Sequence, residues 1–166
     1  KASETDYDLA GQAWSSYTNV YGSNGKLASH TGTWDDGRSW SNGYDANGQL
    51  DWEIHYAANG NKTSETDYDL TNQAWANYTN VYGSNGKLLS HAGSWDDGRS
   101  WFNSYDSNGR LDWEVHWAAN GVKASETDYD LGNQPWASHT NVYDSTGKLV
   151  TQSGVNDDGS TWLIHV

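Results

Sequence analysis

The chain has 166 residues, including 11 Trp, 11 Tyr and 18 Gly, with no Cys and a net charge of −13. This acidity argues against nucleic acid and anionic membranes as partners, because both are bound through Lys and Arg. No disulfide or thiolate metal site is available, and no apolar run approaches the roughly 20 residues needed for membrane insertion. Because Leu, Ile, Val and Phe are sparse, we expect a core made mostly of Trp and Tyr.

Three copies of one unit organise the chain. Repeat 1 covers residues 1–61, repeat 2 covers 62–122, and a partial repeat 3 covers 123–166. Because the chain begins in the middle of the pattern, we expect one repeat domain that is a fragment of a longer array. Its first partners are then the neighbouring repeats of the same chain. Every candidate residue occurs in copies, which argues against a single active site and against an enzyme.

Within each copy, turn residues recur about every 12 positions and apolar residues alternate with polar ones between them. In the first copy the turns are expected at 22–26, 35–37, 45–49 and 57–61, each of which places a Gly where positive φ costs little. Alternation is the signature of half-buried strands. The sequence therefore predicts an all-β antiparallel meander of tandem 61-residue repeats with an aromatic core. The sheet is expected to wind in a spiral, solenoid-like or barrel-like form.

The segment at residues 9–21 departs from simple alternation. Trp14 and Val20 would share one face while Tyr17 and Tyr21 share the other, so either both faces are covered or a bulge near Ser15 resets the pattern. A turn at 9–12 would give five strands per copy, and an odd number reverses strand direction between copies. Repeats that keep the same face inward need an even number. We therefore expect a corner at residues 8–14 and effectively four strands.

The heptapeptide "WDDGRSW" occurs at residues 34–40 and again at 95–101. Its Asp-Asp-Gly is expected to form a tight turn that brings the two flanking Trp residues together across a hairpin. The structural interpretation is a repeated hairpin. The alternative is an aromatic platform beside a carboxylate pair, which would bind a sugar ring. The residues of that ligand site would be Trp34, Asp35, Asp36 and Trp40, with Trp95, Asp96, Asp97 and Trp101 in the second copy.

Two neighbouring strands carry an excess of carboxylates. Strands at 50–56 and 64–70 both keep their apolar residues at even positions, so a shared core side predicts that odd residues pair with odd residues. The carboxylates gathered on one face would be Asp51, Glu53, Glu65, Asp67 and Asp69, and again Asp112, Glu114, Glu126, Asp128 and Asp130. Hard oxygen ligands of this kind suit Ca²⁺. The alternatives are a solvated acidic face or a Ca²⁺ site, with no cofactor required for folding.

The strings "YDANGQL" (44–50), "YDSNGRL" (105–111) and "YDSTGKL" (143–149) resemble the core of YD (Rhs-type) repeats. The longer strings are similar to tandem segments of large secreted bacterial proteins of the haemolysin-type calcium-binding (RTX-associated) kind. This resemblance implies an extracellular or cell-surface repeat region. We therefore expect a structural or adhesive segment, with a carbohydrate-binding (lectin-like) module that recognises glycans as the alternative.

Overall fold

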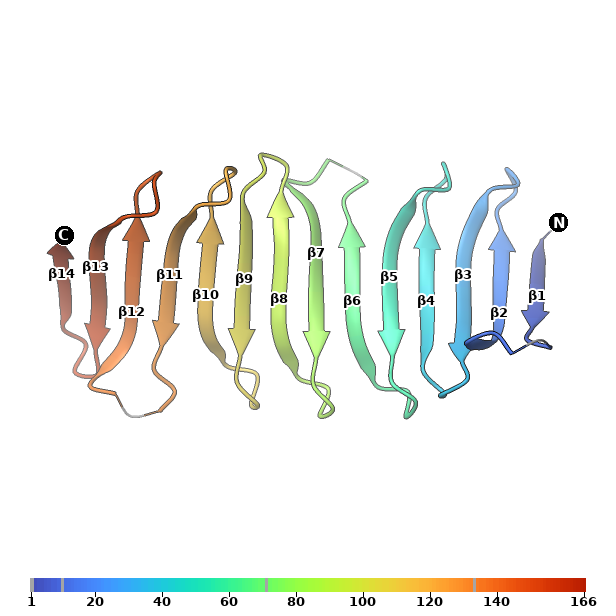
Figure 1. Cartoon of the computed structure of the whole chain (residues 1–166), viewed down its shortest axis with the longest axis horizontal. Helices are drawn as coiled ribbons and strands as arrows, with labels where there is room; N and C mark the ends of the chain where they lie inside the picture. The colour runs from blue at the N-terminus through green and yellow to red at the C-terminus, as the bar shows by residue number, and fades with distance from the viewer. Residues whose placement is uncertain (1, 10, 71, 133) are drawn as a thin grey trace. The chain divides into compact units, whose positions relative to one another are not determined.

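The computed structural model describes residues 2–9, 11–70, 72–132 and 134–166, which form strands and no helix (Figure 1). The strands are β1 (Ser3–Tyr7), β2 (Trp14–Tyr21), β3 (Leu27–Trp34), β4 (Ser39–Tyr44), β5 (Leu50–Tyr56), β6 (Lys62–Tyr68), β7 (Trp75–Tyr82), β8 (Leu88–Trp95), β9 (Ser100–Tyr105), β10 (Leu111–Trp117), β11 (Lys123–Tyr129), β12 (Trp136–Tyr143), β13 (Leu149–Asn156) and β14 (Thr161–His165). The predicted all-β antiparallel meander is confirmed. No helix of the described residues is long and apolar enough to cross a membrane.

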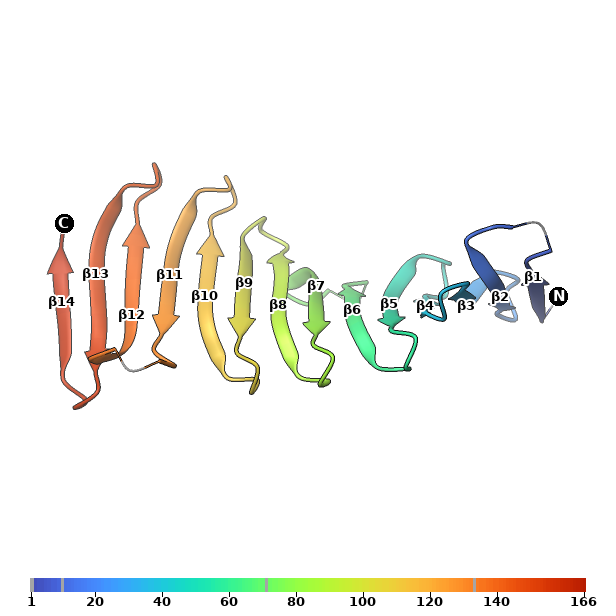
Figure 2. The ribbon, with the colours of Figure 1, turned by 60° about the horizontal axis from the view of Figure 1, so that its bottom comes forward.

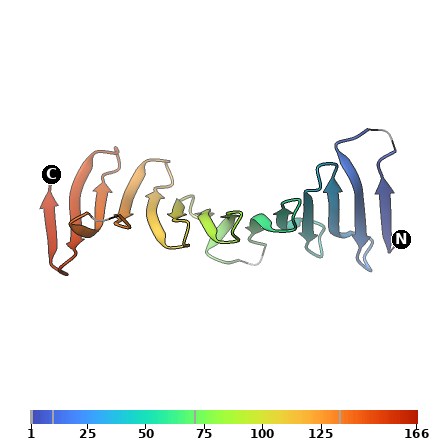
Figure 3. The same ribbon diagram turned by 90° about the horizontal axis from the view of Figure 1, so that it is seen from below.

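The chain divides into two compact units. Unit 1 comprises Lys1–Gln73 with Asn77–Gly86, and unit 2 comprises Ala74–Ala76 with Lys87–Val166. Within each unit the strands follow one another in chain order, β1 to β7 and β8 to β14, and lie side by side in a single layer (Figure 2, Figure 3). Among the strand pairs of the described residues, none joins the first strand of a unit to its last. The sheet is therefore not closed within either unit.

Each complete sequence copy contributes five strands, so the predicted corner and the count of four are wrong. β1 and β2 pair antiparallel, from Tyr7 opposite Ser16 to Ser3 opposite Val20. The Asp8 N–H donates to the Ser15 carbonyl at 3.0 Å and closes the connection. β6 and β7, and β11 and β12, are paired in the same way. Each of these strand pairs is therefore a hairpin and not a corner.

Of the two alternatives left open for the start of β2, the structure has the bulge. The β2–β3 register shifts between Trp14 and Ser16, and the β12–β13 register shifts between Trp136 and Ser138. A bulge adds one residue to one strand and resets its alternation. Trp14 and Tyr17 consequently lie on the same face, with ring centroids 4.9 Å apart.

The odd strand count exchanges the two faces of the sheet from one copy to the next. Directly paired residues share a face, whereas neighbours along a strand point to opposite faces. In unit 1 one row of paired residues runs Glu4, Asn19, His30, Asn42, Glu53, Thr66 and Thr79, and the adjacent row runs Thr5, Thr18, Thr31, Ser41, Ile54, Glu65 and Asn80. Glu65 and Asn80 are the second-copy equivalents of Glu4 and Asn19, yet they lie on the opposite face.

This exchange has a geometric cause. The equivalent strands β1 and β6 of unit 1 point in opposite directions (Figure 1). A shift along the sheet that reversed strand direction but kept the face would turn the repeat into its mirror image, which a chain of L-residues cannot form. A two-fold screw axis that runs along the sheet, across the strands, reverses both the strand direction and the face without changing the hand of the repeat. The same exchange occurs in unit 2, where Glu114 pairs with Thr127 and Val115 pairs with Glu126.

The predicted core of buried Trp and Tyr is wrong. Among the described residues, the one fully buried hydrophobic side chain is Val115, which is 1% exposed, and the tryptophans are partly exposed. The large rings lie against the backbone of their own sheet. Trp40 covers Gly32 and Trp52 covers Gly43, where an added Cβ would come within 2.3 Å of each indole. The sheet therefore gains its apolar burial from rings that pack across strands on both faces.

Candidate functional site

The structure divides the predicted acidic cluster between two faces. β5 and β6 pair even residues with odd ones, with Trp52 opposite Asp67 and Ile54 opposite Glu65. Glu65 and Asp67 therefore share the face of Trp52, whereas Asp51 and Glu53 point to the other face. The second copy repeats this, because Trp113 lies opposite Asp128 and Val115 opposite Glu126. The expected register is wrong because the faces are exchanged where one copy ends and the next begins.

Both carboxylate oxygens of Glu65 accept hydrogen bonds from neighbouring side chains. Its Oε1 accepts hydrogen bonds from Tyr82 Oη at 2.5 Å and Asn80 Nδ2 at 2.9 Å, and its Oε2 accepts one from Lys62 Nζ at 2.5 Å. Burial alone would raise the pKa of Glu65, but the bonds from these three groups outweigh it and lower the pKa to about 2. Burial and the adjacent Glu65 raise the pKa of Tyr82 to about 12.

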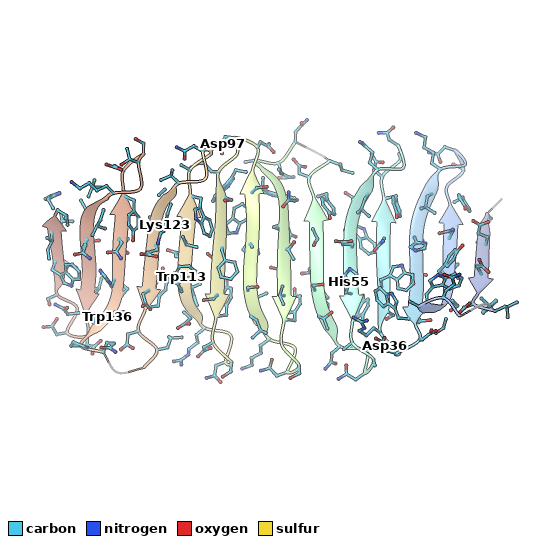
Figure 4. All side chains as sticks on the ribbon, viewed as in Figure 1. Asp36, His55, Asp97, Trp113, Lys123 and Trp136 are labelled. Carbon is cyan, nitrogen blue, oxygen red and sulfur yellow. The ribbon has the colours of Figure 1, made fainter. Side chains whose placement is uncertain are left out.

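The same arrangement is repeated at Glu126, which accepts bonds from Tyr143, Asn141 and Lys123 (labelled in Figure 4). At Glu4, the partners include Tyr21 and Asn19. A carboxylate whose oxygens already hold ammonium, phenol and amide donors is held ionised and fixed in place. This cluster ties β6 to β7 and β11 to β12, and its physical role is to hold strands together.

The other predicted acidic residues have different surroundings. Asp130 lies beyond β11 and accepts the backbone N–H of Gly132 and of Gln134, at 2.5 Å and 2.6 Å. It borders an open hollow of about 400 Å³ together with Asp112, Asp128 and Trp136. Within the part of the chain that the structure describes, no group of three or more Asp, Glu or His side chains is placed to hold a metal ion. The solvated acidic face and the Ca²⁺ site both stay alternatives, and the calcium titration described in the Discussion distinguishes them.

The "WDDGRSW" segments form the predicted hairpins. The Gly37 N–H donates to the Trp34 carbonyl at 3.0 Å, and Gly37 has φ +85°. Asp36 accepts the Arg38 backbone N–H at 3.1 Å and its Nε–H at 2.8 Å, and these contacts lower the pKa of Asp36. Asp97 and Arg99 repeat them at the same distances. Asp36 and Asp97 lie in turns, whereas His55 and Trp113 lie over strands (Figure 4).

The remaining carboxylates of these turns also have local contacts. Asp35 accepts a hydrogen bond from Ser15 Oγ at 3.0 Å, and its backbone N–H donates to the Ala13 carbonyl. The Asp96 N–H donates to the Ala74 carbonyl at 3.3 Å. The Asp35 carboxylate and the backbone N–H groups of Asp35 and Asp96 therefore hold each hairpin against the residues around the start of β2 or β7.

The predicted Trp pairs belong to a longer row of rings. Trp34 and Trp40 have centroids 4.4 Å apart, and Trp95 and Trp101 have centroids 4.2 Å apart. In unit 1 the row comprises Trp14, Tyr17, His30, Trp40, Trp34 and His55, and we call it the aromatic strip. It crosses β2 to β5 on one face. Its rings are partly exposed. Trp14 and Tyr17 meet edge to face at 69°, His55 stacks on Trp34 at 15°, and the other pairs are tilted.

The sequence did not predict that His30 and His55 belong to this aromatic strip. Their one signal was their equal position in the first two copies. His30 Nδ1 lies 2.7 Å from Asn19 Oδ1, and Gln152 Nε2, at the equivalent position, donates to Asn141 Oδ1. His30 Nδ1 is therefore the protonated nitrogen of the neutral ring, and burial lowers the pKa of His30.

Beside the strip, Asn42 Oδ1 and its equivalent Asn103 Oδ1 are buried without a hydrogen-bond partner. Asn42 pairs directly with His30 in the β3–β4 register. An unpaired buried amide oxygen is costly, and its repetition in two copies makes it a regular feature of the fold.

The comparisons with known proteins do not identify a family. No family model matches the chain, and no curated protein matches it. Among the solved structures with a weak similarity to this chain are the following two. The GtfA/B complex bound to UDP and GlcNAc is 14% identical over 59% of this chain, with a TM-score of 0.32. A porin-like protein from Bacteroides uniformis is 14% identical over 93% of this chain, with a TM-score of 0.27. The chain spans 24% and 59% of their lengths, respectively.

Proposed function

We propose that this chain is a structural, adhesive repeat segment of a longer bacterial protein that is secreted or held at the cell surface, and that it performs no catalysis. The observation that carries this proposal is the equivalence of the two junctions between copies. At both junctions the last strand of one copy pairs with the first strand of the next in the same register.

The contacts at the junctions support the proposal. The register shift falls between His55 and Tyr56 at the first junction and between His116 and Trp117 at the second. Tyr68 Oη donates to Glu53 at 3.4 Å, and Tyr129 Oη donates to Glu114 at 3.2 Å. Copies are thus joined by the same ladder bonds that join strands inside a copy. An array can therefore lengthen by whole copies with no new type of interface.

Two further features of the expected architecture belong to this proposal. In a longer array the sheet winds, since strands carry an inherent right-handed twist that accumulates along a sheet. The resemblance to YD and RTX-associated segments supports a location outside the cell. The ion pairs of Glu65 with Lys62 and of Glu126 with Lys123 support a further part of the proposal, that folding requires no cation.

The test adds copies of residues 62–122 to the chain. Each added copy is expected to raise the free energy of unfolding and to increase the hydrodynamic radius by regular steps, as measured by urea denaturation and sedimentation. An added copy that unfolded in a separate transition, or that left the urea midpoint unchanged, would contradict an extension role.

Glycan recognition is a second candidate, favoured by the partial exposure of the aromatic strip. Amide and acid side chains, Asn19, Asn42 and Glu53, lie on the same face. Against it, the Arg38 guanidinium lies 5.3 Å from the Trp34 ring centroid and covers part of the expected platform. A glycan array probed with the chain and with its Trp34→Ala variant tests this candidate. Binding that survives the substitution excludes the strip as the site.

A further inference from the structure

A hollow of about 180 Å³ opens on one face of β5, β6 and β7 in unit 1. It is lined by Trp52, Ile54, Glu65, Thr66, Asp67 and Tyr78. Trp52 lies opposite Asp67, which lies opposite Tyr78, so an indole, a carboxylate and a phenol form one row across the three strands. The position of Trp52 is set by Gly43, on which the indole lies.

The fold already binds ammonium groups with this combination of side chains. Lys62 Nζ lies 2.5 Å from Glu65 Oε2 and 5.3 Å from the Tyr82 ring centroid. Lys123 Nζ lies 2.9 Å from Glu126 Oε2 and 4.9 Å from the Tyr143 ring centroid. A carboxylate beside an aromatic face is therefore a recurrent ammonium site in this protein, supplied from within the chain.

Asp67 presents the same chemistry without an internal cation. Its Oδ2 accepts one long hydrogen bond from Tyr78 Oη, at 3.3 Å, and no Lys or Arg of the described residues pairs with it. Burial raises the pKa of Asp67, and the nearby Asp51 and Asp69 carboxylates raise it further. Glu65, in the same hollow, is already neutralised by Lys62. The hollow therefore carries an uncompensated negative charge against an aromatic wall.

We propose that this hollow binds a protonated amino sugar, whose ammonium group pairs with Asp67 and whose apolar ring face packs on Trp52. The volume is that of about six water molecules, which suits a single sugar ring. The net charge of −13 favours a cationic ligand over a neutral or acidic one. The proposal goes beyond the extension role and does not depend on it.

The experiment follows the indole N–H signal of Trp52 by ¹H–¹⁵N NMR during titration of the whole chain. Glucosamine is expected to shift this signal saturably, whereas N-acetylglucosamine, which lacks the charge, leaves it unmoved at the same concentration. The Asp67→Asn variant keeps the side-chain shape and is expected to lose about tenfold or more in affinity, as for removal of a charged hydrogen bond.

Asp6→Asn is the matched control. Asp6 accepts the same phenol bond, from Tyr17 Oη at 3.3 Å, but it lies on β1 and has no Trp opposite it in the β1–β2 register. Its substitution removes an equal charge and is expected to leave the titration unchanged. Equal binding of the two sugars, equal loss in both variants, or no shift with glucosamine would overturn the proposal.

Two further comparisons test the ligand class and the role of the phenol. Propylammonium, which has the charge without the ring, is expected to bind about tenfold more weakly than glucosamine. Equal binding would overturn the sugar assignment.

In unit 2, Trp113 lies opposite Asp128, and Asp128 lies opposite His139 in place of a Tyr. The Trp113 signal is expected to shift only at higher glucosamine concentration, and equal affinity there would overturn the role of Tyr78.

Discussion

Substitution of Glu65 by Gln is expected to remove a large part of the pH dependence of folding stability in the acid range. Gln keeps an oxygen that can accept from Tyr82 and Asn80 but carries no charge to pair with Lys62. The hydrogen bonds from these three residues overcome the opposing effect of burial and hold the pKa of Glu65 at about 2, against 4.5 for an unperturbed Glu. The folded state therefore binds the Glu65 proton more weakly than the unfolded state.

The sign and size follow from proton linkage. A depressed pKa stabilises the folded state above pH 4.5, and this contribution is lost as the pH falls from 4.5 towards 2. At 1.36 kcal/mol for each pH unit, the contribution of Glu65 is at most about 3 kcal/mol. Solvent screening reduces it, because the Glu65 side chain is 26% exposed and Lys62 is 37% exposed.

Urea denaturation between pH 2 and pH 6 measures this difference. Wild-type stability should rise with pH, and the Glu65→Gln variant should rise less, with the two profiles converging near pH 2. Glu53→Gln is the control, because the contacts of Glu53 are longer than those of Glu65: Tyr68 Oη lies 3.4 Å away and His55 Nε2 lies 4.0 Å away. Parallel profiles for wild type and Glu65→Gln would refute the reasoning.

Two other perturbations have defined outcomes. Gly43→Ala should destabilise the chain by about 1–3 kcal/mol in urea denaturation, because the new Cβ would lie 2.3 Å from the Trp52 indole and displace it. Gly132→Ala, whose Cβ would meet only Asp130 Oδ1 at 3.6 Å, should change stability by less than about 0.5 kcal/mol, and equal effects would contradict the stacking. Millimolar Ca²⁺ compared with EDTA at fixed ionic strength should shift the melting temperature by less than about 2 °C, because the carboxylates are divided between two faces. A rise of many degrees would instead establish a cation site.

The local features of the fold could be predicted from the sequence. The spacing of Asn-Gly and Asp-Gly turns and the alternation between them predict the strands, since both signals act within a few residues. The "WDDGRSW" hairpin is the clearest case, because the Asp36 side chain and Gly37 satisfy the turn by themselves. The bulge that brings Trp14 beside Tyr17 was one of the two options that the pattern left open.

The candidate sites could be predicted only in part. The residue types were recognised, but the grouping of Glu65 with Glu53 was wrong and the pairing of Trp52 with Asp67 was missed. The cluster of Glu65 with Tyr82 and Lys62 was not predicted either. Tyr82 lies on a different strand from Glu65, and Lys62 lies three residues before Glu65 on the same strand. The residue pattern of a single strand does not show which side chain of the adjacent strand each residue will contact.

Local residue patterns are enough to predict which residues of one strand share a face and where the chain turns. How those faces align between strands depends on the tertiary structure. The same alignment sets which groups each acidic side chain contacts. A change of one residue in register moves a whole strand's side chains to the opposite face. Whether residues 8–14 form a corner or a hairpin sets the number of strands to four or five, and five strands exchange the faces between copies. That outcome depends on pairing across the whole copy, which no local pattern contains.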